Sequence, residues 1–197
     1  MAKKVNTPFL PLLLLLLLFS LATVSLSATI KTLRDTDSDP ENECVYTIYV
    51  RTGTIWKGGT DSLIGVQLAG ADGEGVQIPD LVKWGGLMEA DHDYYERGNL
   101  DIFSGRAPCM ESPPCWMNLT SDGTGVGHGW YCNYVEVTAT GPHRGCAQQL
   151  FTVEQWLATD TSPHQLYAER DNCPAPAPGS AAAGGRRRAR GAVRVGV

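Results

Sequence analysis

Two segments of this chain alternate apolar and polar residues with a period of two. The apolar positions are Tyr46, Ile48 and Val50 in the first segment, and Ile64, Val66 and Leu68 in the second. A period of two with aromatic and β-branched residues is typical of half-buried β-strands. The glycine-rich residues 52–61 between them are too many for a tight turn. The sequence therefore predicts an opening hairpin of two strands, whose loop carries Trp56 and Asp61.

Similar short segments recur along the chain, separated by glycine-rich turns. They predict further strands at 76–79, 94–97, 100–103, 130–138, 149–158 and 165–170. Residues 80–88 are expected to form an irregular connection and residues 104–122 a long loop, and no segment has a convincing amphipathic helical pattern. Strands at intervals of about ten residues indicate an all-β sandwich. One domain of roughly 130 residues can bury an adequate core.

Both ends of the chain are expected to lie outside this domain. Residues 1–27 hold two lysines, an apolar run over 12–19 and then small residues, which is the pattern of a secretory signal peptide. A signal anchor is the alternative, because residues 9–26 approach the length needed to span a bilayer. Residues 28–43 form an acidic leader. Residues 174–197 are rich in Pro, Ala and Gly and then in Arg, which predicts a disordered tail.

The charge balance is uneven along the chain. The whole sequence has 16 Lys and Arg against 21 Asp and Glu, and the signal peptide holds two of the lysines and the tail five of the arginines. Neither end holds an acid, so residues 28–173 keep 9 basic and 21 acidic residues, a net charge of −12. Nucleic-acid binding is disfavoured, because it requires a basic surface. Cations, or a surface reached through cations, are the better match.

Cysteines and a glycosylation motif favour an oxidising compartment. The six cysteines all lie between the two ends, at Cys44, Cys109, Cys115, Cys132, Cys146 and Cys173. An even number in an exported chain predicts disulfides, whose pairing cannot be deduced from sequence alone; Cys44 and Cys173 bracket the domain and could tie its ends together. The absence of a Cys-x-x-Cys motif disfavours zinc. The sequon at Asn118 predicts an exposed loop that carries a glycan.

Several longer motifs together resemble one known domain. They include GTDS at 59–62, YYERGNLDIF at 94–103, FSGRAPC at 103–109 and HGWYCNYVEV at 128–137. Taken together, residues 44–173 resemble the PLAT (LH2) domain, most closely that of small secreted plant-stress PLAT proteins. The resemblance implies an eight-stranded antiparallel β-sandwich that is not catalytic. It also implies docking to a lipid surface or a protein partner, residence in the endoplasmic reticulum, and a role in abiotic stress and growth.

The family pattern usually has an aliphatic residue at the position of Cys132. Three disulfides, or two disulfides with two other cysteines left free, therefore remain as alternatives.

The loop between the first two predicted strands offers oxygen ligands. Gly59, Thr60 and Asp61 can supply two carbonyls, a hydroxyl and a carboxylate, which are the ligand types that calcium prefers. In calcium-binding PLAT domains a similar turn contributes ligands, so the resemblance supports this site. Its expected partners from elsewhere in the chain are Asp91, Asp93 and Asp122. The alternative is that Thr60 and Asp61 only hydrogen-bond their own turn.

Two tryptophans are expected to contact a membrane. Trp56 and Trp84 lie outside the predicted strands, and an indole ring can sit at the level of lipid headgroups. Calcium would first have to cancel the repulsion between acidic loops and an anionic leaflet. The alternative is that both rings fold back onto the sandwich, as is expected for Trp130 and Trp156 because these two lie on strands.

No catalytic group of residues is evident in the sequence. It lacks a His-x-x-x-His pair and a Gly-x-Ser-x-Gly elbow. Glu96 and Asp101 could be imagined as an acid and base, but Arg97 makes an ion pair the better interpretation. We therefore expect a monomeric, non-enzymatic binding module of the endoplasmic reticulum lumen or the apoplast. It would bind a lipid surface, with calcium as its cofactor; the alternative is an adaptor for a lumenal protein.

Overall fold

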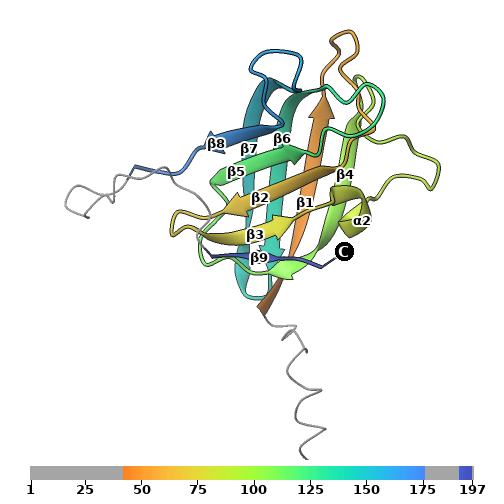
Figure 1. Cartoon of the computed structure of the whole chain (residues 1–197). Helices are drawn as coiled ribbons and strands as arrows, with labels where there is room; N and C mark the ends of the chain where they lie inside the picture. The colour runs from red at the N-terminus through yellow and green to blue at the C-terminus, as the bar shows by residue number, and fades with distance from the viewer. Residues whose placement is uncertain (1–41, 176–190, 197) are drawn as a thin grey trace, which may run out of the picture. The chain divides into compact units, whose positions relative to one another are not determined.

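The computed structural model describes residues 42–175 and 191–196, which belong to one compact unit (Figure 1). The predicted signal peptide, nearly all of the acidic leader and most of the predicted tail lie outside the described residues. Within the described part of the chain, no helix combines the length and the apolar character needed to cross a bilayer.

The described residues form a sandwich of two sheets with one short helix. The strands are β1 (Glu43–Thr52), β2 (Ile64–Ala69), β3 (Glu74–Ile78), β4 (Leu100–Pro108), β5 (Trp116–Ser121), β6 (Trp130–Gly141), β7 (Arg144–Leu157), β8 (Tyr167–Asp171) and β9 (Gly191–Arg194), and the helix is α2 (Leu81–Gly85). One sheet has the order β4-β1-β6-β7, and the other has the order β8-β5-β2-β3-β9. Strands β1–β8 pair antiparallel, which confirms the predicted all-β sandwich of eight strands.

The core lies between the two sheets, as the period-two pattern predicts. Tyr46, Ile48 and Val50 of β1 are at most 1% exposed, and so is Leu68 of β2. Burying each aliphatic side chain of this size stabilises the fold by roughly 1.5–3 kcal/mol. Trp130 is also fully buried, and its indole N–H donates to Thr52 Oγ1 over 3.0 Å, so that neither polar group is left unpaired in the core.

The predicted opening hairpin is wrong, although both of its strands exist. β1 pairs with β4 and β6, whereas β2 pairs with β3 and β5 in the other sheet. The alternating pattern shows that each strand has one buried face, but it does not specify the hydrogen-bonded neighbour. The residues between Thr52 and Ile64 therefore form a crossover from one sheet to the other.

Two further expectations about strands and loops are wrong. Residues 94–97 form a turn, in which Tyr95 has a φ of 64° and a buried ring. The expected long loop over 104–122 contains the end of β4 and all of β5. Asn118 therefore lies half-buried on a strand between Gln67 and Glu169, and not on an exposed loop. Prolines before β5 concealed the alternation of its buried residues, Met117 and Leu119.

Two disulfides join cysteines of the described domain, Cys44 to Cys109 and Cys115 to Cys173. Cys132 and Cys146 are free, so the alternative with two disulfides is the one observed, and the suggested tie between Cys44 and Cys173 is wrong. The pairing follows the sheets: β1 and β4 are neighbours, as are β5 and β8, so each disulfide links the ends of adjacent strands. With sequence separations of 65 and 58 residues, each is expected to stabilise the fold by about 4 kcal/mol.

The predicted disordered tail contains a strand near its end. Residues Gly191–Arg194 form β9, which pairs parallel to β3, and the N–H of Val195 donates to the carbonyl of Gln77 over 2.9 Å. Val195 is half-buried against the core. The composition of the tail as a whole hid this short segment, in which Ala192, Val193 and Val195 provide strand propensity.

Candidate functional site

The loop that follows β1 carries Trp56 and is held in place by Tyr131 of β6. Its tip closes where the N–H of Gly58 donates to the carbonyl of Ile55 over 3.0 Å. The N–H of Tyr131 donates to the carbonyl of Gly58 over 2.9 Å, and the carbonyl of Tyr131 accepts from the N–H of Gly53 over 2.8 Å. Because one strand residue binds both sides of the tip, the loop is fixed to the sheet.

The fixed loop presents Trp56 to solvent. The side chain is 75% exposed, and the Arg97 guanidinium carbon lies 5.8 Å from the centre of its ring, which permits a cation–π contact. Val126, on the loop before β6, is 94% exposed and lines the same open hollow as Trp56. The prediction of an exposed Trp56 agrees with this arrangement, which also places a second apolar side chain beside it.

Three carboxylates meet beside this hollow. Asp61, Asp93 and Glu96 are exposed, and each offers an oxygen within 4.8 Å of the others. Asp61 follows the Trp56 loop, while the other two precede β4. Negative charges at this spacing repel one another unless a cation lies between them. Oxygen atoms of carboxylates are ligands that calcium prefers, so the residues present are compatible with a calcium ion.

The other predicted calcium ligands are not part of this cluster. Thr60 is buried; its hydroxyl accepts from the N–H of Ser62 in its own turn over 3.1 Å and donates to the carbonyl of His128 over 3.3 Å, so its side chain joins this turn to the loop before β6. Gly59 allows its loop to pack closely against the backbone of Arg97, because a Cβ at this position would lie only 2.9 Å from the Arg97 backbone nitrogen. Asp91 is exposed but lies outside the cluster.

Asp122 has a structural role in its own loop. Its carboxylate accepts hydrogen bonds from the N–H of Leu63 and from the N–H and hydroxyl of Thr124, at 2.9–3.0 Å. A limited loss of solvation acts to raise the pKa of the exposed Asp122, but these hydrogen bonds outweigh it and hold the pKa below the usual 3.8. The carboxylate therefore joins the loop before β6 to the start of β2.

A buried carboxylate anchors the segment that carries Asp93 and Glu96. Asp101 of β4 is fully buried, accepts from the N–H of Tyr95 over 2.8 Å and lies 2.6 Å from His92 Nε2. The sequence interpretation considered Asp101 with Glu96 and not with His92. Asp101 and Phe103 are two residues apart on β4 and therefore point to the same, inward face. This spacing is the signal that could have shown Asp101 to be buried and in need of a partner such as His92.

Glu96 was missed as a cluster member because residues 94–97 were expected to form a strand. The turn at Tyr95 instead brings Glu96 towards Asp61, and Arg97 lies over Trp56, not in the predicted ion pair with Glu96.

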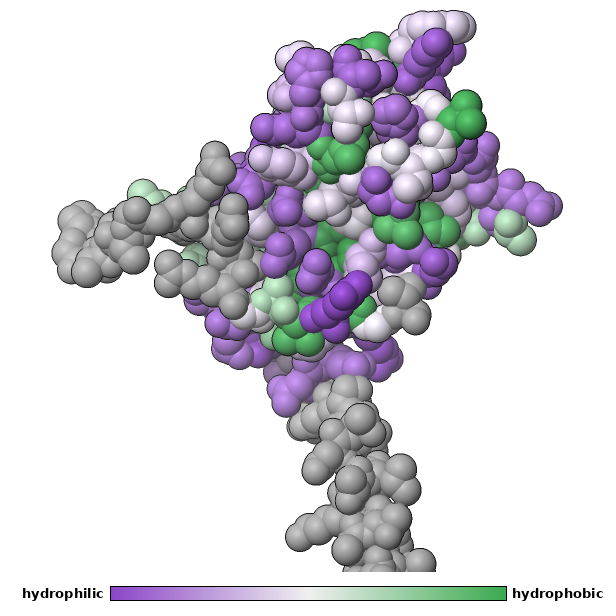
Figure 2. Space-filling model, viewed as in Figure 1, coloured by the Kyte–Doolittle hydropathy of each residue, from purple (hydrophilic) through white to green (hydrophobic). Residues whose placement is uncertain are grey.

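The other four tryptophans are structural, and Trp116 of β5 is buried in the sandwich. Trp84 of α2 is half-buried, and a Cβ added at Gly105 of β4 would lie 2.6 Å from its ring, so the predicted membrane contact through Trp84 is replaced by packing on that strand. Trp130 is buried as expected, and Trp156 is half-buried with its ring edge-on to Tyr131. Figure 2 shows a largely hydrophilic face with separate apolar patches.

The family follows from comparison with known sequences. The sequence model of the PLAT/LH2 domain matches residues 46–170. The chain belongs to the PLAT/LH2 domain family. PLAT domain-containing protein 1 of Arabidopsis thaliana is 57% identical over 149 residues, covering 76% of this chain and 81% of that protein. PLAT domain-containing protein 2 of the same plant is 54% identical over 162 residues, covering 82% and 84%.

Comparison with solved structures returns coral 8R-lipoxygenase among its matches. It aligns with a TM-score of 0.47 and 20% identity, covering 64% of this chain and 16% of the lipoxygenase chain. The two Arabidopsis relatives are named after the PLAT domain and not after a reaction. The two disulfides of this PLAT domain are consistent with an extracellular or secretory-pathway protein.

Proposed function

We propose that this PLAT protein is a non-catalytic module that attaches to a lipid surface through the Trp56 loop, with calcium bound by Asp61, Asp93 and Glu96. The observation that carries the proposal is the position of a 75% exposed tryptophan, on a loop fixed to the sheet, beside three clustered carboxylates. An indole ring is suited to the headgroup region of a bilayer. Membership of a family whose domain, in lipoxygenases, mediates lipid or protein interactions supports the same reading.

Calcium has two roles in this proposal. It neutralises carboxylates that otherwise repel an anionic leaflet, whose negative surface potential attracts cations. It also ties the residues before β4 to the connection between β1 and β2, because Asp93 and Glu96 lie on one and Asp61 on the other. The exposed side chains of Trp56 and Val126 then enter the interface, with Arg97 available for lipid phosphates.

Vesicle co-sedimentation tests the proposal. The full chain is mixed with phosphatidylcholine vesicles with or without phosphatidylserine, in calcium or in chelator. We expect binding to the anionic vesicles in calcium, and a loss of about tenfold or more in affinity for Trp56→Ala and Asp61→Asn. Asp91→Asn is the matched control, because Asp91 is also exposed and acidic but lies outside the cluster. A folded protein that binds no vesicle in either condition would remove the lipid function.

The cellular setting is part of the same proposal. Entry into the secretory pathway rests on the leader pattern of residues 1–27 and on the two disulfides. A role in abiotic stress and growth rests on the resemblance to plant PLAT proteins. Expression of the chain with a C-terminal fluorescent tag would test the route: a diffuse cytosolic signal contradicts it, and a reticular or apoplastic signal supports it.

A protein adaptor is the second candidate function, and one observation favours it. The pairing of β9 with β3 shows that this sheet edge accepts an additional short strand, which is a common way to bind an extended peptide. Binding of a lumenal protein that persists in Trp56→Ala but is lost when β3 is altered would favour this adaptor over the lipid module.

A further inference from the structure

A second hollow lies at the end of the sandwich away from Trp56. β1 begins there at Glu43, whereas its other end, Thr52, leads into the Trp56 loop. The pocket has a volume of about 290 Å³ and lies between the start of β1, the segment after β4 and the hairpin that joins β6 to β7. Its apolar lining includes Cys44, Met110, Pro113, Pro114, Ala139 and Ala147.

The size of the pocket limits what it can hold. A water molecule in the liquid occupies roughly 30 Å³, so the pocket corresponds to about ten waters. Pockets for small molecules begin near this volume, at roughly 300 Å³. The part of a ligand that lies inside the pocket is therefore about ten non-hydrogen atoms in size, which suits a small molecule.

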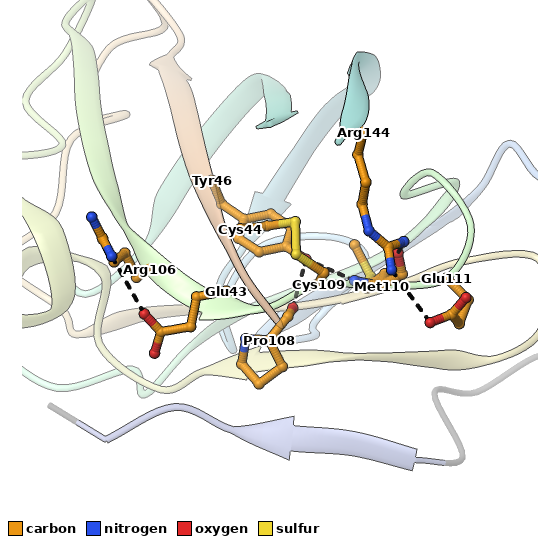
Figure 3. The surroundings of a disulfide bond; sticks show 9 residues. All are labelled: Glu43, Cys44, Tyr46, Arg106, Pro108, Cys109, Met110, Glu111 and Arg144. Atoms are coloured by element: carbon orange, nitrogen blue, oxygen red, sulfur yellow. Dashed lines mark hydrogen bonds and ion pairs between the residues drawn. A yellow bond between two sulfur atoms is a disulfide. The ribbon is translucent and has the colours of Figure 1, made fainter. Parts of the chain in front are cut away.

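Among the described residues that line the pocket, Arg144 is the only one with a positively charged side chain. Figure 3 shows its side chain reaching from β7 towards Met110 and Glu111. Arg144 Nη1 donates to the carbonyl of Met110 over 2.9 Å, and Nη2 lies 3.4 Å from Glu111 Oε1. In a domain with a strongly negative net charge, this guanidinium is a local site for an anion.

Tyr46 keeps the guanidinium in position through the backbone. Its hydroxyl donates to the carbonyl of Pro108 over 2.8 Å and accepts from the N–H of Met110 over 3.2 Å. Met110 is therefore held between Tyr46 and Arg144, next to the Cys44–Cys109 disulfide that closes this end of the sheet (Figure 3). A charged group held by such a network is preorganised for a ligand and loses less freedom when it binds.

The guanidinium has capacity left for a carboxylate. Within the described part of the chain its two hydrogen bonds use two of the five N–H donors that an arginine carries. The Glu111 side chain is 79% exposed and its contact is long, so this ion pair contributes little and can be exchanged. A ligand carboxylate can bind the planar guanidinium through two hydrogen bonds at once.

We propose that this pocket binds a small amphiphilic monocarboxylate, whose apolar part lies between Met110, Ala139 and Ala147 and whose carboxylate replaces Glu111 on Arg144. Glu111 thus acts as an internal competitor that occupies the guanidinium when the ligand is absent. This site is separate from the Trp56 surface and does not depend on the proposed lipid function.

Calorimetric titration of the full chain with three probes of equal length tests the proposal. Octanoate carries the carboxylate, 1-octanol lacks the charge, and octylamine reverses it, each used below the concentration at which it forms micelles. We expect octanoate to bind at least about tenfold more tightly than either of the others. Equal binding of octanoate and octylamine, or no binding of octanoate to the folded chain, overturns the proposal.

Variants separate the two halves of the site. Arg144→Gln is expected to weaken octanoate by about tenfold and to leave 1-octanol within about twofold, because only the charged contact is lost. Arg144→Lys is expected to weaken octanoate less, since it keeps the charge but not the planar fork. Glu111→Gln is expected to tighten octanoate, and Ala147→Leu to block both probes by filling the pocket. Unchanged octanoate affinity in Arg144→Gln contradicts the proposal.

A control in the Trp56 loop distinguishes this site from the lipid surface. Trp56→Ala is expected to leave octanoate binding unchanged while it weakens vesicle binding by about tenfold or more. Loss of octanoate binding in Trp56→Ala would place the probe at the lipid surface and overturn the pocket assignment. Thermal unfolding of each variant shows whether it is folded before its titration is interpreted.

Discussion

The N–H of Tyr131 donates to the carbonyl of Gly58 over 2.9 Å, from a sheet strand to the loop that exposes Trp56. The carbonyl of the same residue accepts from Gly53 on the other side of the loop. The position of Trp56 is thus determined by the sandwich and not by the loop alone. A binding side chain on a fixed loop loses less conformational freedom when it meets its target than one on a mobile loop.

Substitution of Gly53 tests this clamp. A Cβ at Gly53 would lie 2.5 Å from Tyr131 Cδ1, so we expect Gly53→Val to displace the loop and to destabilise the fold by about 1–3 kcal/mol. Vesicle affinity should fall with it, because Trp56 loses its fixed position. Denaturant unfolding and co-sedimentation measure the two effects. Gly145→Ala is the control for stability, because nothing lies within 4 Å of its added Cβ; equal behaviour of the two variants contradicts the clamp.

Two buried tyrosines should respond in opposite ways to loss of the hydroxyl. Tyr95 is buried, and its hydroxyl has no hydrogen-bond partner among the described residues, whereas the hydroxyl of Tyr46 makes two hydrogen bonds. Tyr95→Phe should therefore leave the free energy of unfolding unchanged or raise it by at most about 3 kcal/mol. Tyr46→Phe should lower it by about 1–3 kcal/mol. Chemical denaturation at pH 7 measures both; a destabilised Tyr95→Phe would contradict this account.

The same pair predicts a loss of stability at high pH. Burial raises the pKa of Tyr95 well above 10, with a further contribution from the charges of Asp101 and Asp80, and burial also raises the pKa of Tyr46. Because the folded-state pKa exceeds the unfolded-state value of about 10, their contribution is present below pH 10 and is lost as the pH rises through the folded-state pKa. The free energy of unfolding, measured as the pH is raised above 10, should fall less in Tyr95→Phe than in the natural sequence. The remaining fall is the part due to Tyr46.

The features that the sequence predicted best depend on the local alternation of apolar and polar residues. Apolar residues recur at every second position around Ile48 and around Leu68, so both strands and their buried faces could be assigned without a structure. Their partners could not, because β1 and β2 have the same pattern whether they pair in one sheet or face each other across the core. Asn118 shows a second reason: prolines and a sequon before and within β5 carry a loop signal that the packing of Met117 and Leu119 overrides.

The candidate site was predictable only in part. Asp61 and Trp56 could be singled out because a glycine-rich loop between strands exposes its side chains. Glu96 could not, because its approach to Asp61 depends on the left-handed turn at Tyr95, a conformation that a tyrosine adopts only when the surrounding structure enforces it. The pocket near Arg144 combines three distant segments and has no sequence signal of its own.

The two free cysteines should differ in reactivity. Cys146 is exposed, whereas Cys132 is buried, and burial raises the pKa of the Cys132 thiol far above its usual range, with Arg170 opposing this only in part. Since the thiolate is the reactive form, a thiol reagent at pH 8 should label Cys146 in the native protein and Cys132 only after unfolding. Mass spectrometry of the labelled chain identifies the sites. Cys146→Ser should abolish native labelling, and native labelling of Cys132 would contradict the burial.

The buried Asp101 should couple stability to the carboxylate cluster. It accepts from the N–H of Tyr95 and pairs with His92, and both partners lie in the segment that carries Asp93 and Glu96. Asp101→Leu leaves the buried N–H of Tyr95 unpaired and removes the partner of the partly buried His92, so we expect a destabilisation of about 1–3 kcal/mol.

The same change should weaken calcium-dependent vesicle binding well below the unfolding temperature, where the chain is still folded, because Asp93 and Glu96 lose their anchor. Asp91→Asn is the matched control, since Asp91 neighbours His92 but neither contacts Asp101 nor belongs to the cluster. If Asp101→Leu lowers stability but keeps the full calcium response, the buried carboxylate supports the core alone, and the cluster is positioned by the Gly59 approach to Arg97 instead.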